Sequence, residues 1–274
     1  MISKYYRLIH ISLYIALVNS SPLILVSNRD EVLDRPTSSA RFWDPPYNHI
    51  LGPYDLLRQE HGTWIGVNRQ GKVCVLLNIH KNVNEIKKIS RGLFTREYLE
   101  STDGVKEWIA KATKKYGDDL QQTGGFYMFL ADLNDNGDPP MLFSNQDPPR
   151  TCTEPKLSLS NSETESDHWP KVDIGEQVFD EIISEAQENN WSEDALIEAL
   201  FRGLSTDTFP RDEPANIELV RHSVFVPPFK FPNGDLYGTR TQTVYLVDRN
   251  GNARYVEKTL QDSLISEFKY KIGA

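Results

Sequence analysis

"SNRDEVLDRP", residues 27–36, joins the end of an apolar run to a dense group of charged side chains. The run at 23–26 (LILV) predicts a buried strand over 22–28, and Arg29 and Asp30 follow it side by side. Successive side chains of an extended chain point to opposite faces. We therefore expect Arg29 and Asp30, at the end of this strand, to enter two different polar networks.

Outward from this stretch, the apolar periodicity predicts several further strands and helices. Predicted strands are 11–18, 63–68, 72–78 after a turn at Gln70-Gly71, 125–133, 139–145, and a hairpin whose turn is Asn250-Gly251. Predicted helices are 93–117, broken near Thr102 and ended by Gly117, then 172–187, and 192–203 with Ser192 as its cap. The polar segment 157–171 resembles a linker, 205–221 a charged loop, and the C-terminus a short amphipathic tail.

The order of these elements is strands, helices, strands, helices, strands, and the hairpins are antiparallel. This order favours an α+β fold in layers over a doubly wound parallel sheet. The glycine-rich motifs that bind nucleotide phosphates are absent from the sequence, so nucleotide sites of those kinds have no basis here.

The composition is that of an ordinary globular protein. The chain has 274 residues, 39% hydrophobic and 25% charged, and a net charge of −9, which disfavours nucleic acid and anionic membranes as partners. The two cysteines, Cys74 and Cys152, are too few for a disulfide framework or a cysteine-based zinc site. Cys74 lies in "VCVLL" and is expected to pack as a small hydrophobic residue, which suits a reducing compartment.

The N-terminal 21 residues carry no acidic side chain, and residues 8–18 are mostly apolar. The segment is too short and too polar for a membrane span, so we expect no transmembrane segment. A targeting presequence and a buried strand both suit this composition, and the residues Ile, Tyr, Leu and Val favour the strand.

Four motifs appear in a fixed order: "NRDE" (28–31), "RP" (35–36), "GTW" (62–64) and "GTRTQT" (238–243). Together they resemble the NRDE family, also called the transport and Golgi organisation 2 family, from about residue 15 to residue 257. The resemblance implies an α+β fold, a four-layer αββα sandwich of antiparallel sheets like that of the N-terminal nucleophile (Ntn) hydrolases. It also implies a single domain over 1–274, with 1–13 as a candidate extension.

A fainter similarity links the chain to the choloylglycine and penicillin V acylase branch of those hydrolases. That branch uses an N-terminal Cys, an Arg and an Asp after the second strand, two Asn residues and a late Arg. The matching positions here are Arg29, Asp30, Asn78, Asn161 and Arg240, and with Asn28 they form the candidate pocket. In such an enzyme the free α-amino group is the base for its own thiol, Asn side chains hold the oxyanion, and Arg residues bind carboxylates.

The chain departs from this pattern at its start, because Tyr14 stands where the N-terminal Cys is expected. Two classes of function stay open. One is a non-catalytic binding or carrier protein for a small hydrophobic or amphipathic ligand, linked by resemblance to Golgi organisation, secretion, and lipid or haem handling. The other is an amide hydrolase or acyl transferase. A scaffold without a ligand is a third reading, and the expected compartment is the cytoplasm, with Golgi or mitochondrial association.

Five further residues beside these motifs are candidate binding residues: Trp43, His61, Thr63, Trp64 and Thr239. The two tryptophans suit core packing as well as a pocket wall. His61 is a candidate haem ligand, and so are His80 and His168. Arg29 and Asp30 also suit plain structural pairing, since buried charges need partners in any case, and Asn161 suits helix capping.

Overall fold

The computed structural model describes residues 10–18, 21–79, 89–134, 138–162, 167, 169–212 and 214–273. The chain divides into two compact units. The first unit contains Pro36–Glu154 and the C-terminal residues from Tyr270, and the second contains Ile9–Arg35 and Pro155–Lys269. Each unit has one sheet, and each strand pair of described register is antiparallel.

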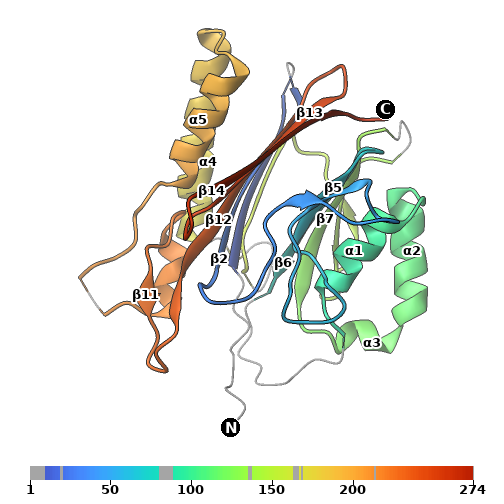
Figure 1. Cartoon of the computed structure of the whole chain (residues 1–274), viewed down its shortest axis with the longest axis horizontal. Helices are drawn as coiled ribbons and strands as arrows, with labels where there is room; N and C mark the ends of the chain where they lie inside the picture. Colours follow the sequence, from blue (N-terminus) through green and yellow to red (C-terminus); the bar gives the residue numbers. More distant parts are fainter. Residues whose placement is uncertain are drawn as a thin grey trace. The chain divides into compact units, whose positions relative to one another are not determined.

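The sheet of the first unit has the order β3-β4-β5-β6-β7-β8-β9, so strands that follow each other in sequence pair with each other. Its strands are β3 (Arg41–Phe42), β4 (Ile50–Gly52), β5 (Ile65–Asn68), β6 (Lys72–Asn78), β7 (Phe126–Asp132), β8 (Met141–Ser144) and β9 (Arg150–Thr151). Its helices are α1 (Gly92–Glu100), α2 (Val105–Tyr116) and α3 (Asp118–Gln121). Helices α1 and α2 lie against one face of the sheet (Figure 1).

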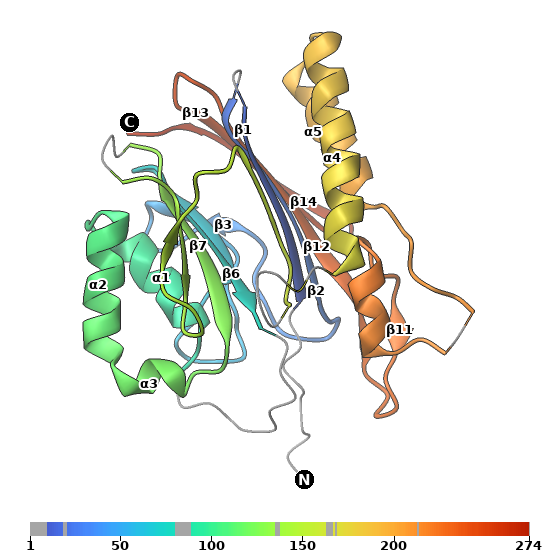
Figure 2. The ribbon, with the colours of Figure 1, turned by 180° about the vertical axis from the view of Figure 1, so that it is seen from behind.

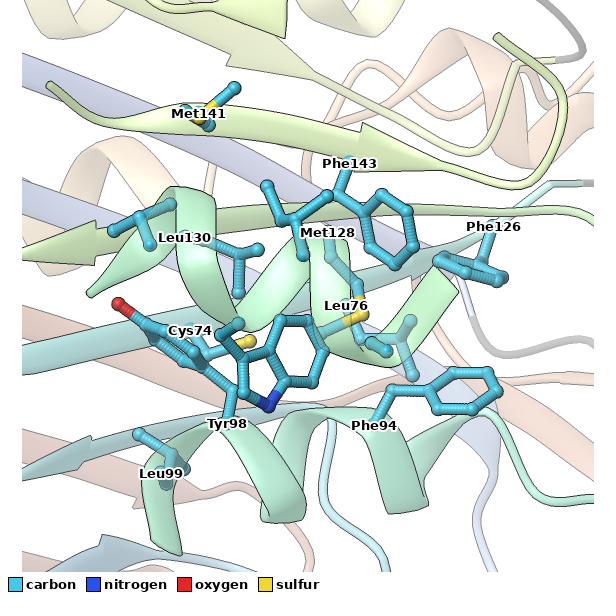
Figure 3. Packing of buried hydrophobic residues seen from close by; sticks show 14 of the residues in the cluster. Cys74, Leu76, Phe94, Tyr98, Leu99, Phe126, Met128, Leu130, Met141 and Phe143 are labelled. Carbon is cyan, nitrogen blue, oxygen red and sulfur yellow. The ribbon is translucent and has the colours of Figure 1, made fainter. Parts of the chain in front are cut away.

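The core of this unit lies between that face and the helices (Figure 3). Phe94 and Tyr98 of α1 meet side chains of β6, β7 and β8, among them Cys74, Met128 and Phe143. The prediction that Cys74 packs as a small hydrophobic residue is confirmed, because its side chain is fully buried in this cluster. Burial also raises the pKa of the Cys74 thiol, which keeps it protonated and unreactive.

The sheet of the second unit has the order β10-β1-β2-β12-β13-β14, and β11 also pairs with β12. Its strands are β1 (His10–Val18), β2 (Ser21–Val32), β10 (Lys156–Leu159), β11 (Phe229–Lys230), β12 (Leu236–Val247), β13 (Asn252–Thr259) and β14 (Leu264–Lys271). Its helices are α4 (Pro170–Glu188), α5 (Glu193–Leu204) and the 3-10 helix η1 (Ile217–His222).

Helices α4 and α5 cover one face of this sheet (Figures 1 and 2). Alternate residues of β1, β2 and β12 face them and form a second core cluster, which includes Tyr14, Val26, Phe179 and Val244. Contact with the two helices therefore identifies which strand residues lie on the covered face of the sheet.

Most predicted elements are confirmed to within a few residues. Residues 11–18 lie in β1, the strand 72–78 is β6, the hairpin at Asn250-Gly251 joins β12 to β13, and Ser192 caps α5 by accepting from the backbone NH of Ala195. The α+β class with antiparallel sheets is also confirmed. Each unit supplies one sheet and one helical layer of the four layers expected, and the single-domain assignment of 1–274 stays a prediction.

Two predictions are wrong. Strand β2 continues to Val32, so Arg29 and Asp30 lie within the strand and not at its end. The supposed linker 157–171 contains most of β10 and the start of α4. In both cases pairing or packing with distant segments overrides the local polarity. The break of the 93–117 helix near Thr102 is confirmed, and α2 follows Gly104. The C-terminal tail contains strand β14.

Among the described residues, no helix has both the length and the apolar character needed to cross a membrane.

Candidate functional site

The pleat of β2 separates the charged motif into two networks. Asn28 and Asp30 face α4 and α5, where the Asn28 side chain donates to the carbonyl oxygens of Leu204 (2.7 Å) and Val224 (2.8 Å). On the opposite face, Arg29 Nη2 donates to Glu31 Oε2 at 3.1 Å. The opposite orientation of Arg29 and Asp30 follows from their place inside an extended strand.

Asp30 forms a buried ion pair with a residue that sequence reasoning missed. Lys171 Nζ lies 3.4 Å from Asp30 Oδ2, and both side chains are 0% exposed. Thr239 Oγ1 donates to Asp30 Oδ1 at 2.7 Å. Burial raises the pKa of Asp30, although Lys171 and Thr239 oppose this change. Burial likewise lowers the pKa of Lys171, although the negative charge of Asp30 acts to raise it.

Lys171 is the second residue of α4, directly after Pro170. A cation near a helix N-terminus is disfavoured by the helix dipole, and burial adds a desolvation cost. The position is tolerable because Asp30 supplies the opposite charge. Pro170 is a sequence signal that could have placed the helix start here, since proline suits the first turn of a helix. Nothing local indicates that the next side chain turns inward.

Arg240 lies at an irregularity of β12. Thr239 pairs with Asp30 and Thr241 pairs with Arg29, so Arg240 is an extra residue, a β-bulge, between two regular pairs. Arg240 Nη1 donates to the carbonyl oxygen of Arg35. The side chain is 9% exposed, and its Nε has no hydrogen-bond partner in the part of the chain that the structure describes. Burial lowers the pKa of Arg240.

Tyr14 does not lie beside Asp30 in the sheet. The β1–β2 register sets Tyr14 opposite Val26, whereas the backbone of His10 lies opposite Asp30. That Tyr14 stands at the position of an N-terminal nucleophile stays a prediction. The ring of Tyr14 packs on Phe179 and its Oη donates to Asp180 Oδ1 at 2.5 Å. Burial and Asp180 raise the pKa of Tyr14, so the phenol stays protonated and serves packing.

A small cavity lies between this sheet and α4. Its volume is about 20 Å³, and its lining includes Ser12, Tyr14, Ser158 and Lys171. The hydroxyls of Ser12 and Ser158 have no hydrogen-bond partner among the described residues. A space of this size holds a water molecule, so in this form it does not accommodate a hydrophobic ligand.

The other predicted site residues are distributed over both units. Asn161 lies buried just after β10 in the second unit, whereas Asn78 ends β6 in the first. The convergence of both with Asp30 and Arg240 on one pocket therefore stays a prediction. Thr239 belongs to the Asp30 network described above.

Of the candidate binding residues in the first unit, Trp43 is a core residue whose Nε1 donates to the Gly52 carbonyl at 2.9 Å, and Trp64 is buried. Thr63 Oγ1 donates to the Ile65 carbonyl. His61 is exposed and stacks on Tyr54, and its role as a haem ligand stays a prediction. His80 and His168 lie outside the described residues. Within the described ranges, no group of three or more His, Cys, Asp or Glu side chains is placed to hold a metal ion.

Two solved structures share a distant likeness with the chain. One is an N-acylethanolamine-hydrolyzing acid amidase ortholog of Caenorhabditis elegans, with a TM-score of 0.43 and 14% identity, covering 85% of this chain and 91% of that one. The other is a mutant of the conjugated bile acid hydrolase of Clostridium perfringens, with a TM-score of 0.41 and 10% identity, covering 93% and 92%. At TM-scores below 0.5, such likenesses say nothing about activity.

Curated relatives match over most of their length. The Transport and Golgi organization protein 2 homolog of Bos taurus is 30% identical over 256 residues, covering 89% of each chain. The Homo sapiens homolog is 28% identical over 261 residues, covering 92% of this chain and 91% of the relative. The family model described as Transport and Golgi organisation 2 matches residues 12–262. The chain therefore belongs to the transport and Golgi organisation 2 family.

Proposed function

We propose that this chain is a non-catalytic binding or carrier protein for a small amphipathic ligand, and that it serves transport and Golgi organisation from the cytoplasm, with Golgi or mitochondrial association. The family description supports the cellular role. The ligand is a hydrophobic body with an anionic group, such as a fatty acid or a haem with its propionates. Both ligands share the carboxylate chemistry that an arginine recognises.

The proposal rests mainly on the bonding partners of the Asp30 carboxylate. In the enzyme reading this carboxylate would orient the amine of an N-terminal nucleophile. Here Asp30 is fully buried and bonded to Lys171 and Thr239, on the face of the sheet that α4 and α5 cover. Tyr14, the residue expected at the nucleophile position, is bonded to Asp180. The charged motif therefore serves the structure of the chain, which favours binding over catalysis.

Arg240 is the residue best suited to hold the anionic group. Its guanidinium is mostly buried and always charged, and its Nε has no hydrogen-bond partner within the described residues. A buried donor without a partner is costly, and a carboxylate would remove that cost through a charge-assisted hydrogen bond. This charge recognition would fix the orientation of an amphipathic ligand.

Binding is tested with the purified full chain, using a fatty acid that carries a fluorescent reporter and, separately, haem. Arg240→Gln should weaken binding of the recognised ligand by about tenfold, the loss of one charge-assisted hydrogen bond. The matched control is Arg254→Gln, which removes an arginine that pairs with Glu193, Asp194 and Glu267 elsewhere on the same sheet. A haem-specific loss in His61→Ala would identify haem as the ligand, and the absence of binding to either probe would refute the proposal.

The enzyme alternative is tested on the same protein. An acyl amide that releases a fluorescent amine should remain intact over hours with the wild-type chain. Hydrolysis above that of the heat-denatured protein, lost in Asp30→Asn and retained in Arg254→Gln, would overturn the carrier proposal in favour of an amide hydrolase.

The cellular role is tested by complementation. Drosophila melanogaster has a relative named Transport and Golgi organization protein 2, which is 25% identical over 261 residues. In cultured cells depleted of that relative, this chain should restore the secretion of a reporter protein, and Arg240→Gln should not. Equal rescue by both forms would separate the cellular role from ligand binding at Arg240.

A further inference from the structure

We propose that Asp30, Lys171 and Thr239 are positioning residues, which together hold the β-bulge of β12 that presents Arg240 to the anionic group of the ligand. The inference rests on the proposed function for the identity of that ligand, but the positioning itself concerns the chain alone. All of these residues belong to the second unit.

The bulge keeps the side chains of β12 on the correct face of the sheet on either side of Arg240. On one side of it, Thr239 pairs with Asp30, and on the other, Gln242 pairs with Asn28 and Val244 with Val26. Asp30, Asn28 and Val26 all face the helices, as the contacts of Asn28, Asp30 and the core cluster show. Without the extra residue, one half of β12 would be shifted by one position and its side chains would turn to the wrong face.

Thr239 fixes the backbone next to the bulge through three hydrogen bonds. Its Oγ1 donates to Asp30 Oδ1 at 2.7 Å and accepts from the backbone NH of Val226 at 2.8 Å. Its own backbone NH donates to the Val226 carbonyl at 2.8 Å. The single hydroxyl therefore links β2, β12 and the segment that contains Val226.

The neighbouring Gly238 shows how closely that segment approaches. A Cβ atom at this position would lie 3.0 Å from Val226 O and 3.0 Å from Pro228 Cα, which are both backbone atoms that cannot move independently. The chain before Arg240 is thus confined on one side by the Val226–Pro228 backbone and on the other by Asp30. Contacts on both sides restrict the conformations open to the bulge.

Lys171 completes the arrangement by keeping Asp30 in place as an acceptor. The Asp30 carboxylate is completely buried, and an isolated buried charge would shift towards its neutral form. Lys171 reaches Asp30 Oδ2 from the first turn of α4, so the other oxygen, Oδ1, stays available to accept from Thr239. The bulge is in this way coupled to the docking of α4 on the sheet.

The consequence appears at Arg240. Its carbonyl oxygen accepts from the backbone NH of Leu260, and its Nη1 donates to the Arg35 carbonyl. The Arg240 backbone is therefore held by Leu260 and its guanidinium by the Arg35 carbonyl, while Nε remains without a partner in the described part of the chain. A pre-positioned donor of this kind lowers the ordering cost of binding.

The test uses Thr239→Val, which is nearly isosteric and removes only the hydroxyl, with Thr239→Ser as the conservative variant that keeps it. Thr123→Val is the matched control, because Thr123 is another buried threonine whose Oγ1 donates to a backbone carbonyl, that of Leu120, in the first unit. The first readout needs no ligand. Amide hydrogen exchange at Val226 and the NMR signal of the Arg240 Nε proton are measured in all four proteins.

In Thr239→Val, exchange at Val226 should accelerate by about tenfold, as expected for one lost hydrogen bond, and the Arg240 signal should shift or broaden. Thr239→Ser and Thr123→Val should retain the wild-type values at both positions. Unchanged exchange and an unchanged Arg240 signal in Thr239→Val would overturn the positioning role, whatever the ligand.

The second readout is the preference for a reporter-labelled fatty acid over its methyl ester, which is neutral. The wild type should bind the acid about tenfold more tightly. Thr239→Val and Lys171→Met should lose most of this preference while affinity for the ester stays within twofold, and Thr123→Val should keep it. If the wild type showed no preference while the exchange result held, the proposed ligand would be wrong and the positioning role would stand.

Discussion

At the scale of single residues, the burial of Asp30 and Lys171 decides what the charged motif does. Both side chains are 0% exposed, and they lie 3.4 Å apart in a region from which water is largely excluded. A pair of this kind adds little net stability compared with apolar residues of the same size, but the loss of one partner is costly. The role of the pair is therefore better explained by the position that it gives to Thr239 and Arg240.

This argument predicts a specific pattern of stabilities. Lys171→Met should lower the free energy of unfolding by about 3–5 kcal/mol, because it leaves a buried carboxylate without its counter-charge. The double variant Asp30→Asn/Lys171→Met should recover part of that loss, since no charge then remains buried. Lys156→Met is the control, because Lys156 pairs with Asp180 at the surface, where a pair is worth at most about 1 kcal/mol. Urea denaturation measures all four, and a double variant less stable than Lys171→Met would contradict the reasoning.

A second residue-scale prediction concerns alkaline pH. Burial and a 2.6 Å hydrogen bond to Glu97 raise the pKa of Tyr116 to about 12. Because the unfolded phenol has a pKa near 10, the folded state holds this proton more tightly, so its contribution is complete below about pH 10 and is lost as the pH rises through about 12. The difference in unfolding free energy between wild type and Tyr116→Phe should fall over this interval. A difference independent of pH would show that the phenol is not perturbed.

At the scale of elements, the packing of α4 against α5 depends on a glycine. A Cβ at Gly203 would lie 2.7 Å from Phe179 Cε1 and 2.9 Å from Ile182 Cδ1, whereas a Cβ at Gly175 would meet its neighbours only at 3.8 Å and beyond. Both glycines lie in helices. They therefore form a matched pair in which the change of residue is the same and only the available space differs.

Gly203→Ala should destabilise the protein by about 1–3 kcal/mol, because the two helices have to separate or the Phe179 ring has to rotate. Gly175→Ala should instead stabilise it, by up to about 1 kcal/mol, since alanine favours the helix and meets no obstruction. Thermal unfolding of both variants checks the sign. A stabilising Gly203→Ala would mean that the α4–α5 contact is loosely packed.

The N-terminal strand is the second element with a clear prediction. Strand β1 pairs with β2 on one side and β10 on the other, so it is an internal strand of its sheet. Deletion of residues 1–20 would expose the backbone groups of both neighbours and remove Tyr14 from the core. We expect an insoluble or molten chain, judged by near-UV circular dichroism and by recovery in the soluble fraction. A deletion variant with the wild-type melting temperature would show that β1 is dispensable.

At the scale of the whole molecule, the two compact units are interleaved in sequence. Pro36–Glu154 of the first unit stands between the two segments of the second, and strand β14 belongs to the second unit up to Lys269 and to the first from Tyr270. Neither unit can therefore unfold without releasing chain that is continuous with the other. The single domain expected from the sequence stays a prediction, which this connectivity makes testable.

We accordingly predict one cooperative thermal transition, with equal calorimetric and van't Hoff enthalpies. Hydrogen exchange followed by mass spectrometry should show peptides of β6 and of β12 becoming unprotected together as denaturant is added. Two separate transitions, one for each sheet, would establish that the units are independent domains.

The sequence by itself determined the local elements, the α+β class and the family. The apolar runs, Asn250-Gly251 and the cap at Ser192 are local signals, and they correctly identified the strands, a hairpin and a helix start. The motifs "NRDE" and "GTRTQT" are likewise visible without a structure, and the family they indicated is the one that matches.

Tertiary structure alone decided which residues these motifs meet. Lys171 is 141 residues away from Asp30, and nothing local indicates that a lysine in the first turn of a helix is buried. Likewise, alternation assigns Tyr14 to a face of its strand but not to a partner, and only the register with β2 shows that it lies opposite Val26 and away from Asp30. The physical reason is the same in both cases: a repeat of two residues determines a face, whereas partners and register are determined by the packing of segments that are distant in the chain.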